Sequence, residues 1–321
     1  MPHDCQGMIA MATMKTAGNA PFEEIRFTVR DGLRLYARRY RANAATKRRP
    51  LLCLAGLTRN SRDFHQLAVA LANHPTAPRD VYTLDSRGRG LSEHDRDWRN
   101  YAVPVEMLDA VDFMVRSELH DAAIIGTSRG GLIAMVMAAV QPSLIGAVVL
   151  NDIGPVVEST GLLRISGYVG RSPVPKSWED AARITADINQ RQFPNVTAAQ
   201  WLEFARQLYN EKNGRPMPGY DPKIARSLTV LEGPIPQLWP QFGALAHVPV
   251  MVIRGANSDI LSEATVTEMA RRHPALTRHV VSEEGHAPLL HDAPTIEAIA
   301  GFLGEADGVR RAAASPNAAA A

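Results

Sequence analysis

Cysteine is scarce in this sequence of 321 residues, which has two, Cys5 and Cys53. Cys53 lies inside the apolar run 51–55, whereas Cys5 lies near the N-terminus, so we expect no disulfide between them. Two cysteines also exclude the disulfide framework of a small secreted domain. No spacing of cysteine and histidine matches a zinc site, so we expect no metal.

Charge of one sign is also missing. The chain has 35 Lys and Arg against 33 Asp and Glu, a formal net charge of +2, and no long run of either sign. This balance argues against nucleic acid as a partner. A basic cluster within residues 38–49 is the main exception, and we interpret it as a solvated face.

Long hydrophobic runs are absent as well. No stretch of about 18 apolar residues occurs, so we expect no membrane-spanning helix and no membrane partner. The first twenty residues lack the apolar centre of a secretory signal, which favours a cytoplasmic location. We expect residues 1–20 and 307–321 to be disordered tails.

Hydrophobic residues make up 45% of the chain, enough for a sizeable core. Short apolar runs alternate with amphipathic segments, a rhythm that predicts an α/β fold with a mostly parallel sheet covered by helices on both faces. The first two strands, 25–29 and 33–40, flank an Asp31-Gly32 turn. The later strands are expected at 50–55, 81–85, 121–126, 145–150, 248–254 and 277–282. The expected helices cover 61–73, 103–119, 130–140, 263–272 and 293–303.

Residues 155–243 interrupt this rhythm. Two helical patterns, 177–190 and 197–209, begin with capping signals, and strand alternation is lacking. We therefore expect a core made of 21–154 and 244–306, with 155–243 inserted as a helical cap, or lid, over the edge of the sheet. A helical subdomain that only stabilises the fold is the alternative.

The strongest chemical signal is Gly126-Thr127-Ser128-Arg129-Gly130, a G-x-S-x-G pattern between an expected strand and an expected helix. The chain must turn sharply there, which pushes the Ser128 hydroxyl away from the sheet, and glycines on both sides avoid collisions. Ser128 is thus a candidate nucleophile, although it could instead only cap the helix.

A serine hydroxyl needs a base and a group that orients the base. His286 follows the strand 277–282 and Asp259 follows the strand 248–254, so both belong at the carboxyl edge of the sheet with Ser128. We predict His286 as the base and Asp259 as the acid that orients it. Asp152, which follows the strand 145–150, is the competing acid.

Acyl transfer also needs donors for an oxyanion. The backbone amide of Arg129, at the start of a helix, is one candidate, and the amide of Leu57 in the loop after strand 50–55 is the other. The Gly-rich turn 85–92 lacks the G-x-G-x-x-G spacing of a dinucleotide site, so we expect it to support the active-site loops instead.

Five segments (54–60, 85–92, 126–131, 255–259 and 285–288) together resemble the α/β-hydrolase superfamily, and the resemblance extends from about residue 25 to 304. The resemblance implies an eight-stranded, mostly parallel sheet, no cofactor, and a pocket between sheet edge and cap. The oxyanion loop departs from the usual His-Gly, with Ala55-Gly56 in its place. A serine nucleophile argues against the carboxylate chemistry of epoxide hydrolases and haloalkane dehalogenases.

The expected function is a serine hydrolase of carboxylic esters or lactones, acting on a small, fairly apolar substrate through an acyl-enzyme on Ser128. One alternative with the same three residues is carbon–carbon bond hydrolysis of a vinylogous diketone, or peracid formation. Another is a ligand-binding protein without turnover. A small molecule is the expected partner, and we expect a monomer or homodimer.

Overall fold

The main sheet has nine strands in the residues that the computed structural model describes, which are 12–14, 21–229 and 235–313. The order is β1-β2-β3-β5-β4-β6-β7-β10-β11. In this order the last six strands are mutually parallel, whereas the pairings β1–β2, β2–β3 and β3–β5 are antiparallel. The strands are β1 Ala12–Met14, β2 Glu23–Thr28, β3 Arg34–Tyr40, β4 Leu51–Leu54, β5 Val81–Asp85, β6 Ala122–Thr127, β7 Ile145–Asn151, β10 Val250–Gly255 and β11 Thr277–Val281.

This arrangement confirms the predicted α/β fold and its eight-stranded, mostly parallel sheet, to which the short β1 adds a ninth strand. The central strands are apolar along their whole length because both of their faces are covered: every residue of β4 and β7 is buried. Asp31-Gly32 makes the turn between β2 and β3, with Gly32 at a φ of +89° that favours glycine.

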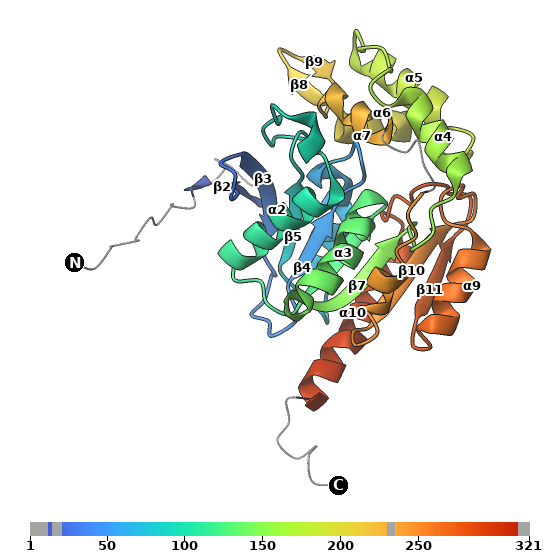
Figure 1. Cartoon of the computed structure of the whole chain (residues 1–321). Coiled ribbons are helices and arrows are strands. Elements are labelled where there is room, and N and C mark those ends of the chain that lie inside the picture. The colour runs from blue at the N-terminus through green and yellow to red at the C-terminus, as the bar shows by residue number, and fades with distance from the viewer. Residues whose placement is uncertain (1–11, 15–20, 230–234, 314–321) are drawn as a thin grey trace.

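Helices cover both faces of the sheet (Figure 1). One core cluster joins the sheet to α2, α3, α8 and α9, and a second joins it to α1 and α10. The core helices are η1 Ser61–Phe64, α1 His65–Ala72, η2 Trp98–Asn100, α2 Val103–Arg116, α3 Arg129–Val140, η3 Pro142–Leu144, α9 Glu263–Arg272 and α10 Ala293–Ala313.

Most of the segment between β7 and β10 forms a group of elements at one end of the sheet (Figure 1). It contains α4 Ser159–Tyr168, α5 Trp178–Asn189, α6 Ala198–Leu208, β8 Asn210–Lys212, β9 Arg215–Met217, η4 Pro222–Ala225, α7 Arg226–Thr229 and α8 Trp239–Gly243. We refer to α4 through α7 as the cap.

Capping side chains start the two longest cap helices. Ser177 accepts a hydrogen bond at the start of α5, and Thr197 with Gln200 forms a capping box on α6. Two details differ from the sequence prediction. The β8–β9 strands add a hairpin to an expected all-helical segment, and α8 packs in the core through the buried Phe242.

The predicted tails also differ in part from the structure. Residues 12–14 pair with β2 as a strand, and α10 continues to Ala313 beyond the predicted end at 303. The expectation of disorder is therefore wrong for residues 12–14 and 307–313. Residues 1–11, 15–20 and 314–321 lie outside the described residues. No helix of the described residues is long and apolar enough to cross a bilayer.

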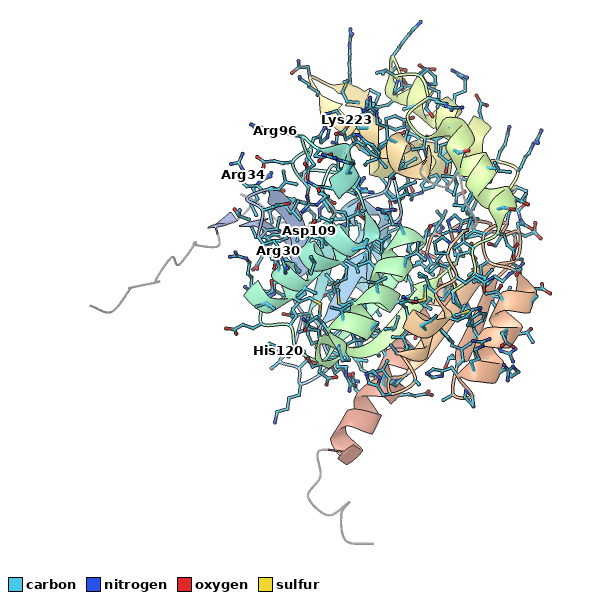
Figure 2. All side chains as sticks on the ribbon, in the orientation of Figure 1. Arg30, Arg34, Arg96, Asp109, His120 and Lys223 are labelled. Carbon is cyan, nitrogen blue, oxygen red and sulfur yellow. The ribbon has the colours of Figure 1, made fainter. Side chains whose placement is uncertain are left out.

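The basic cluster within residues 38–49 is less solvated than its sequence suggests. Arg49 is buried, and it donates hydrogen bonds to Asp307 and to the carbonyl of Ala306 on α10. Arg41 pairs with Glu23. Charged side chains near β2 and β3 are also paired. Figure 2 shows Arg30 and Arg34, which pair with Asp112 and Glu93.

Candidate active site

Ser128 sits on the sharp turn between β6 and α3. Its φ of +51° and ψ of −116° are unusual for a residue with a side chain. A Cβ at Gly126 would lie 2.5 Å from the backbone of Gly130, and a Cβ at Gly130 would lie 2.0 Å from the carbonyl oxygen of Leu54. Both positions therefore require glycine, and the turn lifts the Ser128 side chain above the edge of the sheet.

Ser128 and His286 lie within hydrogen-bonding distance. The Oγ of Ser128 is 2.8 Å from Nε2 of His286, and Nδ1 of His286 is 2.8 Å from Oδ2 of Asp152. Gln192 of the cap accepts a hydrogen bond from the His286 backbone amide, which fixes the loop that carries the imidazole. The three side chains form the serine–base–acid relay that nucleophilic acyl transfer requires.

Asp152 is fully buried, and its carboxylate has three hydrogen-bond partners. Oδ1 accepts from the amide of Gly255, and Oδ2 accepts from the hydroxyl of Ser258 at 2.6 Å as well as contacting His286. Asp152 lies just beyond β7, and Ser128 lies just beyond the neighbouring strand β6. Adjacent strand ends thus bring Ser128 and Asp152 to the same imidazole.

The prediction that Asp259 orients His286 is wrong in this geometry. Arg164 of α4 takes both oxygens of the Asp259 carboxylate, at 2.6 and 2.9 Å. Burial would raise the pKa of Asp259, but the hydrogen bonds from Arg164 and Gln192 outweigh it and lower that pKa. Asp259 therefore ties the cap to the loop after β10, and Asp152, the alternative acid, contacts the base.

The two predicted oxyanion donors lie beside Ser128. Leu57 and Arg129 line the same cavity as its hydroxyl, and neither backbone amide donates a hydrogen bond to another group in the described part of the chain. Arg129 is the first residue of α3, where an amide has no partner within the helix. Both amides are thus available to a ligand, as an oxyanion site requires.

A buried carboxylate connects these two positions, which the sequence reasoning missed. Glu106 of α2 is 2% exposed, and it binds Arg89 at 2.7 Å and the Arg129 side chain at 2.6 Å. Arg89 in turn donates from Nε to the carbonyl oxygen of Leu57 at 2.7 Å. Burial would raise the pKa of Glu106, but the two guanidinium groups outweigh burial and lower it, so the carboxylate is ionised.

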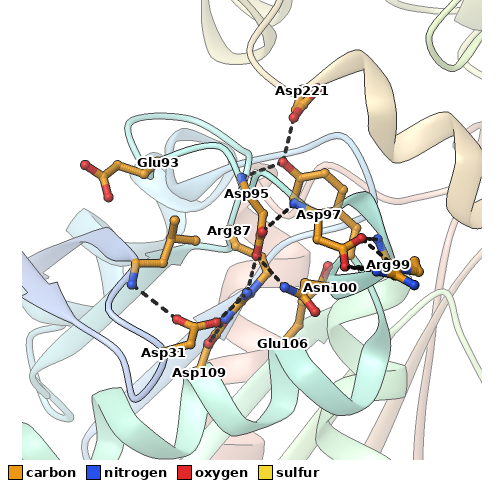
Figure 3. A network of polar contacts seen from close by, with 12 residues as sticks. Asp31, Arg87, Glu93, Asp95, Asp97, Arg99, Asn100, Glu106, Asp109 and Asp221 are labelled. Carbon is orange, nitrogen blue, oxygen red and sulfur yellow. Dashed lines mark hydrogen bonds and ion pairs between the residues drawn. The ribbon is translucent and has the colours of Figure 1, made fainter.

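A larger network extends from the same turn to the cap (Figure 3). Arg87 pairs with Asp95 and Asp109, and burial raises the pKa of Asp109 to about 6 despite that pairing. Tyr101 donates to Asp221 of the cap at 2.6 Å and accepts from the amide of Asp95. The turn 85–92 thus has the supporting role expected of it.

An apolar cavity of about 520 Å³ opens on one side of Ser128. Its walls come from α2, α3, α4 and the segment before α8. The apolar side chains that line it include Leu57, Val103, Leu132, Val136, Ile153, Val157, Leu162, Ile165, Leu228, Leu238 and Ile260. A cavity of this size and character can hold an extended or branched hydrocarbon group.

A smaller, more polar cavity of about 80 Å³ opens on the other side of Ser128, where it is also lined by His286. Thr58, Arg59, Asp63 and Asn189 contribute its polar wall. Ser128 and Ile165 border both cavities. The hydroxyl therefore stands between an apolar chamber and a polar one. In the described residues no group of three or more His, Cys, Asp or Glu is arranged to hold a metal ion.

Comparison with known proteins agrees with this architecture. The model of the Alpha/beta hydrolase family matches residues 51–298. The chain belongs to this family, as the resemblance in its sequence motifs predicted. An α/β hydrolase from Novosphingobium aromaticivorans superposes with a TM-score of 0.82 at 38% identity, over 89% of this chain and 99% of that one.

Two curated relatives are similar to this chain in sequence. The 3-hydroxybutyrate-oligomer hydrolase of Cupriavidus necator is 33% identical over 262 residues, which are 77% of this chain and 86% of that protein. The sn-1-specific diacylglycerol lipase ABHD11 of Xenopus laevis is 28% identical over 79% of both chains. The chain is therefore a hydrolase of this family.

Proposed function

We propose that this protein is a serine hydrolase of carboxylic esters with an apolar acyl group. The observation that carries the proposal is the continuous contact from Ser128 through His286 to Asp152, at 2.8 Å in each step, beside two amides that have no partner in the described part of the chain. A serine nucleophile, a base, an acid and oxyanion donors are the groups that acyl transfer requires.

In the first half of the reaction, the Ser128 oxygen attacks the ester carbonyl carbon while His286 takes the hydroxyl proton. The amides of Leu57 and Arg129 donate to the oxyanion of the tetrahedral intermediate. The bond to the alcohol oxygen then breaks, and His286 gives its proton to that oxygen. Alcohol leaves, and the acyl group stays on Ser128.

In the second half, His286 takes a proton from water, whose oxygen attacks the acyl-enzyme carbonyl. The bond to Ser128 breaks, the serine oxygen regains a proton from His286, and the carboxylic acid departs. Asp152 holds the imidazole so that Nε2 faces Ser128, and it stabilises the imidazolium formed in each half. Because Asp152 also accepts from Gly255 and Ser258, its carboxylate is fixed for this role.

We infer from the two cavities where the alcohol and the acyl part of the ester bind. His286 must reach the oxygen of the leaving alcohol, and it borders the polar cavity and not the apolar one. The alcohol therefore occupies the polar cavity and the acyl chain the apolar cavity. The names of the two curated relatives, a hydrolase of hydroxybutyrate oligomers and a diacylglycerol lipase, support ester cleavage in this chain.

A serine-directed probe and a substrate panel test the proposal together. The wild type should react with a fluorophosphonate at Ser128 and hydrolyse p-nitrophenyl butanoate, whereas Ser128→Ala should do neither. Ser143→Ala changes an exposed serine in η3, and it should behave as the wild type. Turnover of esters by Ser128→Ala would contradict the mechanism.

The same panel separates other chemistries on these residues. It should include a lactone, a vinylogous diketone and a peracid assay beside the esters. Turnover of the diketone without turnover of any ester would replace the proposed reaction. Absence of both labelling and turnover would indicate a binding protein.

A further inference from the structure

Arg59 borders the polar cavity with four of its five guanidinium N–H donors unused in the described structure. Its Nε donates to Asp63 at 2.6 Å, whereas no group in the described residues accepts from its two terminal nitrogens. These nitrogens are not sealed in the protein, because the side chain is 23% exposed and lines both the polar cavity and the next cavity outward. Guanidinium donors in this state are available to a ligand.

The position of Arg59 relative to the nucleophile follows from Gly56. A Cβ at Gly56 would lie 3.4 Å from Cγ of Arg59 and 3.7 Å from Cβ of Ser128, so the two side chains flank one methyl-sized space. The guanidinium also stacks on Phe204 of α6, with its central carbon 4.4 Å from the ring centroid. Asp63 of the core and Phe204 of the cap thus hold the guanidinium in place on the wall of the polar cavity.

The charges around the Arg59 guanidinium favour a ligand with a single negative charge. Arg59 is the one Lys or Arg side chain that lines the polar cavity or the next cavity outward in the described structure. Asp63 neutralises it through one bond only, and the other carboxylate oxygen of Asp63, Oδ1, is buried without a partner. A single carboxylate can form the bidentate pair that Arg prefers while Asp63 keeps Nε.

We propose that Arg59 is a subsite for a carboxylate on the leaving alcohol, so that the substrates are esters in which an apolar acyl group is attached to a small hydroxy acid. This inference rests on the proposed function, because the alcohol is assigned to the polar cavity by the role of His286. It adds a specificity residue that the relay itself does not require.

The test compares two substrates that differ in one charge, 3-(butanoyloxy)butanoate and its primary amide, by release of butanoate. The wild type should prefer the carboxylate, measured as the ratio of kcat/KM values. Arg59→Gln should lower that ratio roughly 10- to 100-fold, the value of hydrogen bonds to a charged group. Asp63→Asn should raise it, because it leaves Arg59 with its full positive charge.

Controls separate this subsite from folding and from the relay. Arg183→Gln removes an exposed arginine of α5 and should leave the ratio unchanged. If Arg59→Gln does not fold, the double variant Arg59→Gln/Asp63→Asn removes both charges of the pair and should show the same loss of preference. Fluorophosphonate labelling of Ser128 identifies the variants with an intact relay.

Three results would overturn the subsite. They are a wild-type ratio near one, an unchanged ratio in an Arg59→Gln variant that is still labelled, and a ratio lowered by Asp63→Asn. A wild type that neither reacts with the probe nor cleaves p-nitrophenyl butanoate would refute the proposed function itself, and the subsite with it.

Discussion

Arg89 donates its Nε proton to the carbonyl oxygen of Leu57 over 2.7 Å, and Leu57 itself lines the cavity beside Ser128. Arg89 is 1% exposed and is itself bound by Glu106, which also binds the side chain of Arg129. One carboxylate thus fixes both loops that carry the proposed oxyanion donors. Donors of this kind act only when they are held close to their final geometry.

Glu106→Gln should therefore slow catalysis more than it weakens substrate binding. We expect kcat to fall about 10-fold or more, which is less than the 10²–10³ of a donor that is lost outright, with a smaller change in KM. Steady-state kinetics with p-nitrophenyl butanoate measures both. Glu305→Gln, on the exposed surface of α10, is the matched control. A raised KM with an unchanged kcat would show that Glu106 acts on substrate binding instead.

The same residue should make folding stability depend on acid. The pKa of Glu106 is lowered in the folded protein, so its contribution is present above the ordinary glutamate pKa of about 4.3 and is lost as pH falls below it. Between about pH 5 and pH 3, the unfolding midpoint should therefore fall less steeply in Glu106→Gln than in the wild type.

An exposed glutamate gives a contrast for that measurement. Arg271 and Arg272 lower the pKa of Glu268 to about 2, but salt screens these exposed ion pairs. In high salt, Glu268→Gln should match the wild type, whereas the effect of Glu106→Gln should persist. An effect of Glu106→Gln that disappears in salt would contradict its role as a buried pair.

The assignment of the acid can be decided with two isosteric variants. Asp152→Asn should lower kcat by about 10⁴, because the amide no longer holds the imidazole in the productive tautomer. Asp259→Asn breaks a bond to Arg164 instead, and it should change kcat by less than about 10-fold. A larger loss in Asp259→Asn than in Asp152→Asn would reverse the assignment.

The apolar cavity should set the length of the acyl chain. Val136 lines this cavity, so Val136→Phe should lower kcat/KM for p-nitrophenyl octanoate more than for the acetate ester. Val140 lies one turn further along α3 and is 52% exposed, which makes Val140→Phe the matched control. An unchanged chain-length profile in Val136→Phe would place the acyl group elsewhere.

The tie between core and cap should matter for stability. Tyr101→Phe removes a donor from Asp221 and an acceptor from the amide of Asp95, both in buried positions. The expected cost is about 1–3 kcal/mol for each group left unsatisfied, measured by denaturant unfolding. Tyr82→Phe removes a hydroxyl without a hydrogen bond in the described residues, and it should cost less.

The sequence predicted the fold because each element follows local rules. The strand Val81–Asp85 and the helix Glu263–Arg272 match their predicted bounds, since a buried parallel strand is a short, mainly apolar run and an amphipathic helix repeats with its own period. Helix α4 escaped prediction because it contains two glycines, Gly161 and Gly167, and has no side-chain cap at its start.

The site was predicted in part for a related reason. Ser128 stands in a motif that the strand–turn–helix geometry requires, and His286 follows a strand at the correct edge. The acid was wrongly predicted because Asp152 and Asp259 both follow parallel strands. Arg164, which binds the Asp259 carboxylate in place of His286, lies on α4, far from Asp259 in the sequence. The positive φ of Asp152, +54°, cannot be recognised from residue type alone.

The positions of Ser128 and Asp152 before the cap, with His286 after it, have an evolutionary consequence. Apart from the contact of Gln192 with the His286 backbone, the relay is built on strand ends of the core. Lengthening a connection costs entropy that grows only with the logarithm of its length. Descendants of this chain could therefore exchange or enlarge the cap, and with it their choice of substrate, without rebuilding the strand ends that carry Ser128 and Asp152.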